Sequence, residues 1–414
     1  MDPKATQGRL DEYAPAFANL FKAMVGSGLL TLPYVTSKVG IGISIPGLAI
    51  CAFMTQYAVR FVVKCAVHMK RSVADVEDDL HRRGSAAHAH GSQSWLIVAR
   101  ASLGAPGVAL TTICLVGAQL GVTASYLSYV GNTFMAFTGL SVLTSRIGLW
   151  IFVSLMCLLR PLQSVAFVSG AALCVYAALL MLVCYYGARA PPHPTEAVNW
   201  GDWSEFGTWF GPAIFAFEGV GPAVSIYESM GHTDSQPFFQ VLTATYGFAV
   251  VIYGSVAVIG YVAWGSAVAP VVIDSFPPTL LADGARLMLA LILALTYPIQ
   301  ITPVFQMMES LVLRTPATQR LWPLTRCAIV GLTAFASFLI PDMEKLVALT
   351  GGVFFSLLGF CLPGIFYLRL RPPADDHGAR SSGASQAQEV ALAIAIVTLG
   401  VVGGVFSVYA ELFR

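Results

Sequence analysis

Two apolar segments of this chain contain glycine and proline clusters near their middle. The first, residues 21–34, carries Gly26-Ser27-Gly28 and Pro33, and the second, residues 210–229, carries Glu218-Gly219-Val220-Gly221-Pro222. An unbroken helix satisfies its own backbone in lipid, whereas such clusters interrupt it and free N–H and C=O groups that need other partners. The sequence therefore predicts two discontinuous membrane helices.

The composition agrees with an all-α membrane protein that is surrounded by lipid. Of 414 residues, 56% are hydrophobic and 11% are charged, and the mean hydropathy is +0.72. A soluble domain is far less apolar. Because 23 Lys and Arg nearly balance 22 Asp and Glu, net charge indicates no nucleic-acid or acidic partner.

A membrane span needs roughly 20 apolar residues, which divides the chain into about eleven transmembrane helices. These candidates cover residues 15–37, 42–67, 107–136, 147–159, 164–186, 208–230, 238–264, 284–313, 321–340, 345–368 and 390–409. We expect a cytoplasmic N-terminal tail (1–14), a ten-helix core (15–371), a flexible cytoplasmic linker (372–388), and an eleventh helix with the C-terminus (389–414).

The distribution of basic residues predicts a cytoplasmic N-terminus. With that orientation, most Lys and Arg lie at inner loops and inner helix ends, as the positive-inside rule requires. Those on the opposite side are Lys38, Arg146, Arg189, Arg286, Lys345 and Arg414. Residues 1–13 are polar and precede a full span, so we expect the first helix to act as its own insertion signal.

The two broken segments are the first and the sixth span, which occupy equivalent positions in two halves of five helices. Because five is odd, the halves are expected to be inverted. A five-plus-five inverted repeat with discontinuous helices 1 and 6 is an architecture of secondary transporters, whose substrate binds near the bilayer midplane.

Local motifs resemble a known family. Residues 22–33, KAMVGSGLLTLP, are similar to the first-helix signature of the amino acid/auxin permease family. Residues 210–221, FGPAIFAFEGVG, look like the unwound sixth helix of its proton-coupled amino acid transporter branch, and Gln119-Leu120-Gly121 with Tyr126 also resembles this branch. The resemblance implies a LeuT-type fold of the APC superfamily and symport of small neutral amino acids by alternating access.

Within this resemblance, Gly26, Ser27 and Gly28 are the expected ligands of the substrate carboxylate. N–H groups at a half-helix N-terminus suit an anion, glycine permits close approach, and a serine hydroxyl adds a donor. The alternative is that these small residues serve only close helix packing.

The substrate amine is expected to meet the carbonyls of Phe215, Ala216 and Phe217. The rings of Phe215 and Phe217, with Tyr126, could shape the pocket. Ordinary packing of these aromatic side chains is the competing interpretation.

Glu218 is a carboxylate near mid-bilayer, where charge is unfavourable unless paired, hydrated or protonated. We interpret it either as the carrier of the coupled proton or as a brace of the unwound backbone. Lys22 lies one turn before Gly26 and either counters a carboxylate or extends to the cytoplasmic interface. Some members of the family carry a histidine near the position of Asn19, and its absence here argues against that proton route.

Sodium is the alternative coupling ion, with Thr296 and Thr302 as candidate ligands. Their spacing of six residues separates them on an ideal helix, although Pro298 and Pro303 can distort it. Protons are therefore favoured.

Other functional classes remain as alternatives. An amino-acid sensor would share the fold without sustained transport. An enzyme is not expected, because no acid-base set or nucleophile motif is present, and no cofactor is expected. His81, His88 and His90 could bind a metal but fit a solvated loop better. Plasma, vacuolar and lysosomal membranes are all compatible with the sequence, and the transported amino acid is left open.

Overall fold

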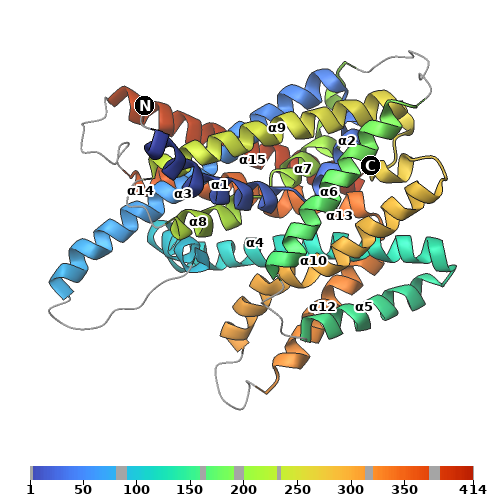
Figure 1. The fold of residues 1–414 in the computed structure, drawn as a ribbon. Coiled ribbons are helices and arrows are strands. Elements are labelled where there is room, and N and C mark those ends of the chain that lie inside the picture. The colour runs from blue at the N-terminus through green and yellow to red at the C-terminus, as the bar shows by residue number, and fades with distance from the viewer. Residues whose placement is uncertain are drawn as a thin grey trace.

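The computed structural model describes residues 3–80, 91–158, 165–190, 200–230, 235–312, 320–372 and 383–413. All regular structure within these residues is helical (Figure 1), as the composition predicts. His81, His88 and His90, and most of the linker 372–388, lie outside the described residues.

The described elements follow one another as helices of very different length. They are α1 (Pro3–Met24), η1 (Ser27–Thr31), α2 (Leu32–Val39), α3 (Ile41–Leu80), α4 (Gly91–Thr138), α5 (Val142–Leu158), α6 (Val165–Gly187), η3 (Trp203–Glu205), α7 (Phe206–Ala216), α8 (Val220–Ser229), α9 (Gln236–Trp264), η4 (Gly265–Ala267), η5 (Val272–Ser275), α10 (Leu280–Val312), α12 (Trp322–Leu339), α13 (Met343–Thr350), η6 (Gly351–Phe355), η7 (Leu357–Cys361), α14 (Leu362–Leu370) and α15 (Gly383–Phe413).

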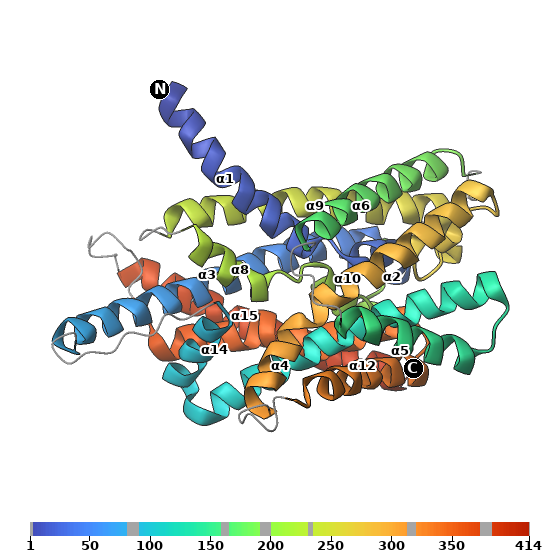
Figure 2. The same ribbon diagram turned by 60° about the horizontal axis from the view of Figure 1, so that its bottom comes forward.

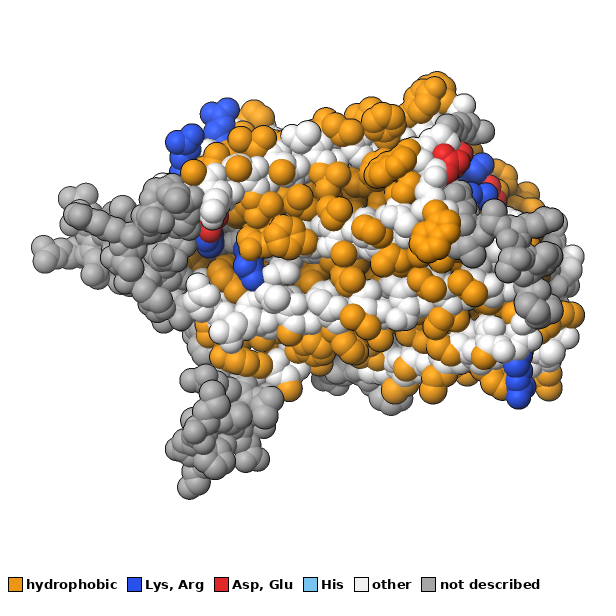
Figure 3. Space-filling view, turned by 90° about the horizontal axis from the view of Figure 1, so that it is seen from above, with side chains coloured by type: hydrophobic (Ala, Val, Ile, Leu, Met, Phe, Trp, Pro, Cys, Tyr) orange, Lys and Arg blue, Asp and Glu red, His pale blue; other side chains and the backbone are white. Residues whose placement is uncertain are grey.

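Eight of the described helical segments are long and apolar enough to cross a membrane. The 17-residue α5 is shorter, and the first and sixth spans are interrupted. Together these segments account for the eleven spans that the sequence predicts. Large apolar side chains are exposed on the outward faces of α5 and α15, where lipid would cover them. Apolar side chains spread over the middle of the face in Figure 3, whereas charged ones gather towards its two ends.

The two breaks occur where glycine clusters predict them. The first span consists of α1, η1 and α2, with residues 25 and 26 outside any helix. The sixth span consists of α7 and α8, which are separated by residues 217–219. Figure 2 shows the N-terminal part of α1 projecting away from the bundle.

The remaining helices hold these broken spans in place by close contacts. Helix α4 packs along α10 and α13, while α15 and α13 pack against α7. Glycines permit the approach: a Cβ built on Gly121 would lie 2.1 Å from the Thr350 hydroxyl, and one on Gly351 would lie 1.9 Å from the Gly211 carbonyl. Such small-residue contacts are the usual packing device between membrane helices. The eleventh span therefore supports the first half of the sixth directly.

Candidate substrate site

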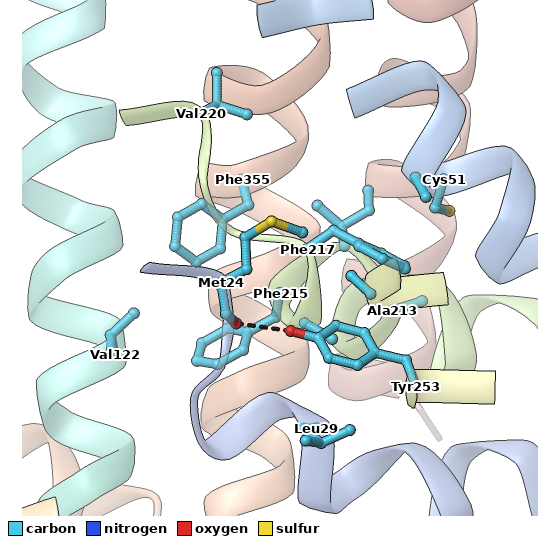
Figure 4. Close-up of a cluster of buried hydrophobic side chains, with 14 of the residues drawn as sticks. Met24, Leu29, Cys51, Val122, Ala213, Phe215, Phe217, Val220, Tyr253 and Phe355 are labelled. Atoms are coloured by element: carbon cyan, nitrogen blue, oxygen red, sulfur yellow. Dashed lines mark hydrogen bonds between the residues drawn. The ribbon is translucent and has the colours of Figure 1, made fainter. Parts of the chain in front are cut away.

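The break in the first span places a short extended segment beside the sixth span. Gly26 is extended, with φ −146° and ψ −164°, and η1 begins at Ser27. The carbonyl of Met24 accepts a hydrogen bond of 2.9 Å from the buried Tyr253 hydroxyl on α9 (Figure 4). A backbone group freed at the end of α1 thus has a side-chain partner inside the bundle.

The break in the sixth span is a tight turn. The N–H of Phe217 donates to the carbonyl of Ile214 at 3.0 Å, and the N–H of Glu218 donates to that of Phe215 at 3.2 Å. A Cβ on Gly28 would lie 2.8 Å from Phe215 Cδ1 and 3.0 Å from Ala216 Cα. The two breaks are therefore in direct contact, and only glycine fits at position 28 without movement.

A cavity of about 360 Å³ lies between these breaks. It is lined from α1 and η1, from α4 and α6, and from the sixth span and α10. The lining residues are Asn19, Lys22, Ala23, Met24, Val25, Gly26, Ser27, Gly28, Val122, Tyr126, Ala172, Leu173, Tyr176, Phe215, Glu218, Pro222, Ile226, Thr296, Ile299 and Gln300.

Most of the residues singled out in the sequence line this one cavity. Those brought together are Lys22, Gly26, Ser27, Gly28, Tyr126, Phe215, Glu218 and Thr296. Ala216, Phe217 and Thr302 do not line it. Phe217 is fully buried beside Tyr253, at 5.1 Å between ring centroids, and points with the other core side chains of Figure 4. The side chain of Phe217 therefore packs in the core, whereas Phe215 faces both the core and the cavity.

The Ser27 side chain is 1% exposed, and its hydroxyl has no hydrogen-bond partner among the described residues. Buried hydroxyls are normally paired. Ser27 is the first residue of η1, so its hydroxyl lies beside the N–H groups of the first turn of η1. This location can supply several donors to one anionic group.

Glu218 is half-buried and belongs to a chain of side-chain hydrogen bonds. Gln119 on α4 donates through Nε2 to Glu218 Oε1 at 3.4 Å, and Gln300 on α10 donates through Nε2 to Gln119 Oε1 at 2.8 Å. A carboxylate can only accept, so its ionised form fixes the orientation of both amides. Tyr176 and Gln300 were not singled out in the sequence, although a polar Gln300 between two prolines of an apolar span is a recognisable signal.

Lys22 is half-buried in the cavity wall and forms no ion pair with any described residue. The two threonines proposed for sodium do not share a site. Thr296 donates to the Ile292 carbonyl at 2.8 Å, and Thr302 donates to the Pro298 carbonyl at 2.6 Å. Across the described residues, no group of three His, Cys, Asp or Glu side chains is placed to hold a metal ion.

The sequence matches the family model described as "Transmembrane amino acid transporter protein" over residues 13–412. The chain belongs to this family. Among its relatives, amino acid transporter AVT3A of Arabidopsis thaliana is 25% identical over 374 residues, covering 87% of this transporter and 82% of the relative. Vacuolar amino acid transporter 3 of Saccharomyces cerevisiae is 26% identical over 407 residues, covering 92% of this transporter and 54% of the relative.

The fold is also similar to a solved transporter. The crystal structure of a manganese transporter from Eremococcus coleocola matches with a TM-score of 0.54 at 12% identity, covering 99% of this chain and 88% of that one. At this identity the likeness shows the fold alone. The LeuT-type fold and the resemblance to amino acid/auxin permeases are thus confirmed, and the relatives are transporters rather than enzymes.

Proposed function

We propose that this transporter carries a small neutral amino acid together with a proton, by alternating access. The observation that carries the proposal is that the unpartnered Ser27 hydroxyl and the Glu218 carboxyl line the same cavity. One group suits the substrate carboxylate and the other suits a mobile proton.

The cavity supports recognition of a zwitterion of limited size. The turn from Gly26 to Gly28 supplies donors for the carboxylate, and the carbonyls of the break at residues 215–217 remain our proposed acceptors for the amine. The rings of Tyr126, Tyr176 and Phe215 bound the remaining space. Before the proton binds, the ionised Glu218 balances the charge of Lys22, so the site favours neither a cationic nor an anionic substrate side chain.

The chain from Glu218 through Gln119 to Gln300 offers a route by which proton binding changes the substrate site. A proton on Oε1 of Glu218 makes the oxygen that faces Gln119 a donor, so Gln119 turns its amide to accept that proton. Gln119 then presents an N–H towards Gln300, whose amide must turn in response. Because Gln300 lines the cavity, the proton on Glu218 alters the donors and acceptors that meet the substrate.

The cavity is proposed to face the cytoplasm in this conformation. It follows the last turns of α1 from Gly26 back to the exposed Asn19. On the opposite side, η5 lies against η1, and Tyr129 donates to Asp274 at 3.5 Å. Asp274 also pairs with Arg286 at 3.5 Å. With a cytoplasmic N-terminus, this is an inward-facing state with a closed outer side.

The proposed membrane is vacuolar or lysosomal, or the plasma membrane, with the cytoplasm as destination. An acidic lumen or exterior would drive the proton inward in each case. The name of the yeast relative, a vacuolar transporter, favours the vacuolar assignment.

Uptake of labelled neutral amino acids into proteoliposomes tests this proposal. Vesicles would receive an inward proton gradient, an inward sodium gradient, or neither. We expect accumulation with the proton gradient alone. Accumulation only with the sodium gradient would indicate that sodium is the coupling ion, with Thr296 as a candidate ligand, and that Glu218 does not carry a proton. Binding without accumulation would indicate a sensor.

A further inference from the structure

A second cavity, of about 560 Å³, lies between α3, α9 and α15, away from the candidate substrate site. Its lining combines aromatic rings with basic and amide side chains. The residues are Tyr57, Arg60, Phe61, Lys64, Gln236, Phe239, Gln240, Thr243, Ala244 and Glu389. No residue is shared with the substrate cavity, so the transport proposal leaves this site without a role.

On one face of α3, the wall of the cavity continues beyond its lining residues to Phe53. Phe53, Tyr57, Arg60 and Lys64 are spaced by three or four residues, which places them on the same side of α3. Phe53 is 46% exposed, and its ring lies 4.7 Å from that of Tyr57. This face of α3 therefore changes from an apolar, lipid-facing surface to a basic one as α3 approaches the side predicted to be cytoplasmic.

The charges in the cavity are not balanced. Lys64 Nζ lies 2.6 Å from Glu389 Oε1, and the Tyr367 hydroxyl donates to the other oxygen of Glu389. Each oxygen of this carboxylate therefore already has one close partner. Arg60 forms no ion pair with a carboxylate in the described part of the chain, so one positive charge remains.

Arg60 is nevertheless held in a defined position. Its guanidinium donates to the Thr243 hydroxyl at 2.7 Å and lies over the rings of Tyr57 and Phe239, at 4.8 and 5.4 Å from their centroids. Its Nε is buried without a hydrogen-bond partner in the described residues. The Thr243 hydroxyl also accepts from Gln56 at 2.7 Å and donates to the Phe239 carbonyl at 2.8 Å. It has no capacity left to serve Arg60 further.

From these observations we propose that the cavity binds the phosphate-bearing headgroup of an anionic phospholipid, with the phosphate on Arg60. A guanidinium suits the geometry of a phosphate. The cytoplasmic leaflet carries the anionic lipids, and the assignment to this leaflet rests on the proposed topology. Free phosphate shares the chemistry, but the exposed Phe53 surface above Arg60 favours a ligand with an acyl chain. The amide of the exposed Gln240 can hydrogen-bond a hydroxylated headgroup. A bound lipid would join α15 to the bundle helices α3 and α9.

Native mass spectrometry of the full-length transporter tests the proposal. Purified protein would be incubated with equal amounts of phosphatidylinositol and phosphatidylcholine, and the retained copies of each would be counted. We expect a preference for phosphatidylinositol that falls about fivefold in Arg60→Gln, since one basic group near a membrane surface has roughly that effect. Arg60→Lys keeps the charge but loses the planar fork, so its preference should lie between those of the wild-type protein and Arg60→Gln.

Two further variants distinguish the site from general effects. Gln240→Glu leaves Arg60 and Thr243 intact but adds a negative charge to the cavity, so it should also lower the preference. Arg100→Gln removes an exposed arginine of α4, on the same predicted side and outside the cavity, and should have no effect. An unchanged preference in both Arg60→Gln and Gln240→Glu, or an equal loss in Arg100→Gln, would overturn the proposal. If inorganic phosphate displaced phosphatidylinositol from the protein, the ligand of the cavity would be free phosphate and not a lipid.

Discussion

Gly28→Ala tests whether direct contact between the two helix breaks shapes the substrate site. The new methyl group would lie 2.8 Å from Phe215 Cδ1, 3.0 Å from Ala216 Cα and 3.2 Å from Ala216 N. Carbon atoms normally approach to about 3.5–4.0 Å, so η1 and α7 must separate by roughly 0.5–1 Å. Two of the three obstructing atoms belong to the backbone and cannot rotate away. Overpacking of this kind costs about 1–3 kcal/mol.

The separation would displace the donors of η1 from the Phe215 side of the cavity. If the whole of this cost of about 1–3 kcal/mol opposes substrate binding, the affinity for the substrate falls by about 5- to 150-fold. We would measure it by equilibrium binding of a labelled transported amino acid to purified protein, together with the unfolding temperature. Gly221→Ala is the matched control, because a Cβ there meets open space and alanine favours helix α8. If Gly28→Ala kept the wild-type affinity and unfolding temperature, contact between the two breaks would not shape the site.

Three further predictions concern single polar groups. Glu218→Gln should abolish uptake driven by a proton gradient and spare counterflow exchange, whereas loss of both activities would indicate that Glu218 only braces the backbone. Tyr253→Phe should lower the unfolding temperature in a thermal melt, since an unpaired buried Met24 carbonyl costs about 1–3 kcal/mol; an unchanged melt would show that this bond contributes nothing. Burial raises the pKa of Asp274, although Arg286 acts in the opposite direction, so the closed outer side binds this proton more tightly than an open one would. Closure should therefore be favoured below this pKa and weaken as the pH rises through it. Hydrogen exchange of residues 268–283, corrected for intrinsic rates, should show more protection at about pH 5 than at about pH 8, and Asp274→Asn should remove the difference; a difference that persists would contradict this.

The sequence was sufficient to locate the two breaks and much of the cavity. Glycine clusters interrupt membrane helices for local steric reasons, so the positions of Gly26 and Gly219 determine where the backbone leaves the helix. The same reasoning placed Ser27, Phe215 and Glu218 beside each other, because equivalent breaks of inverted halves meet at the midplane.

The parts that could not be predicted depend on side-chain direction and on contacts between distant segments. Phe215, near the end of α7, lines the cavity, whereas the side chain of Phe217, in the turn after α7, packs in the core beside Tyr253. Helical periodicity does not apply within a turn, so it could not predict this difference. Gln119 accepts a hydrogen bond from Gln300, 181 positions away, and donates one to Glu218, 99 positions away. No local pattern encodes such pairings. Thr302 lies outside the cavity that Thr296 lines, as their spacing of six residues indicates, so the two prolines do not bring them to one site.

The most direct test of proton coupling is to measure proton movement without imposing a proton gradient. Proteoliposomes containing a trapped pH-sensitive dye would receive an inward gradient of the transported amino acid under a clamped membrane potential. If Glu218 carries the coupled proton, the vesicle interior acidifies with wild-type protein and not with Glu218→Gln. Amino acid uptake by the wild-type protein without any internal acidification would contradict it.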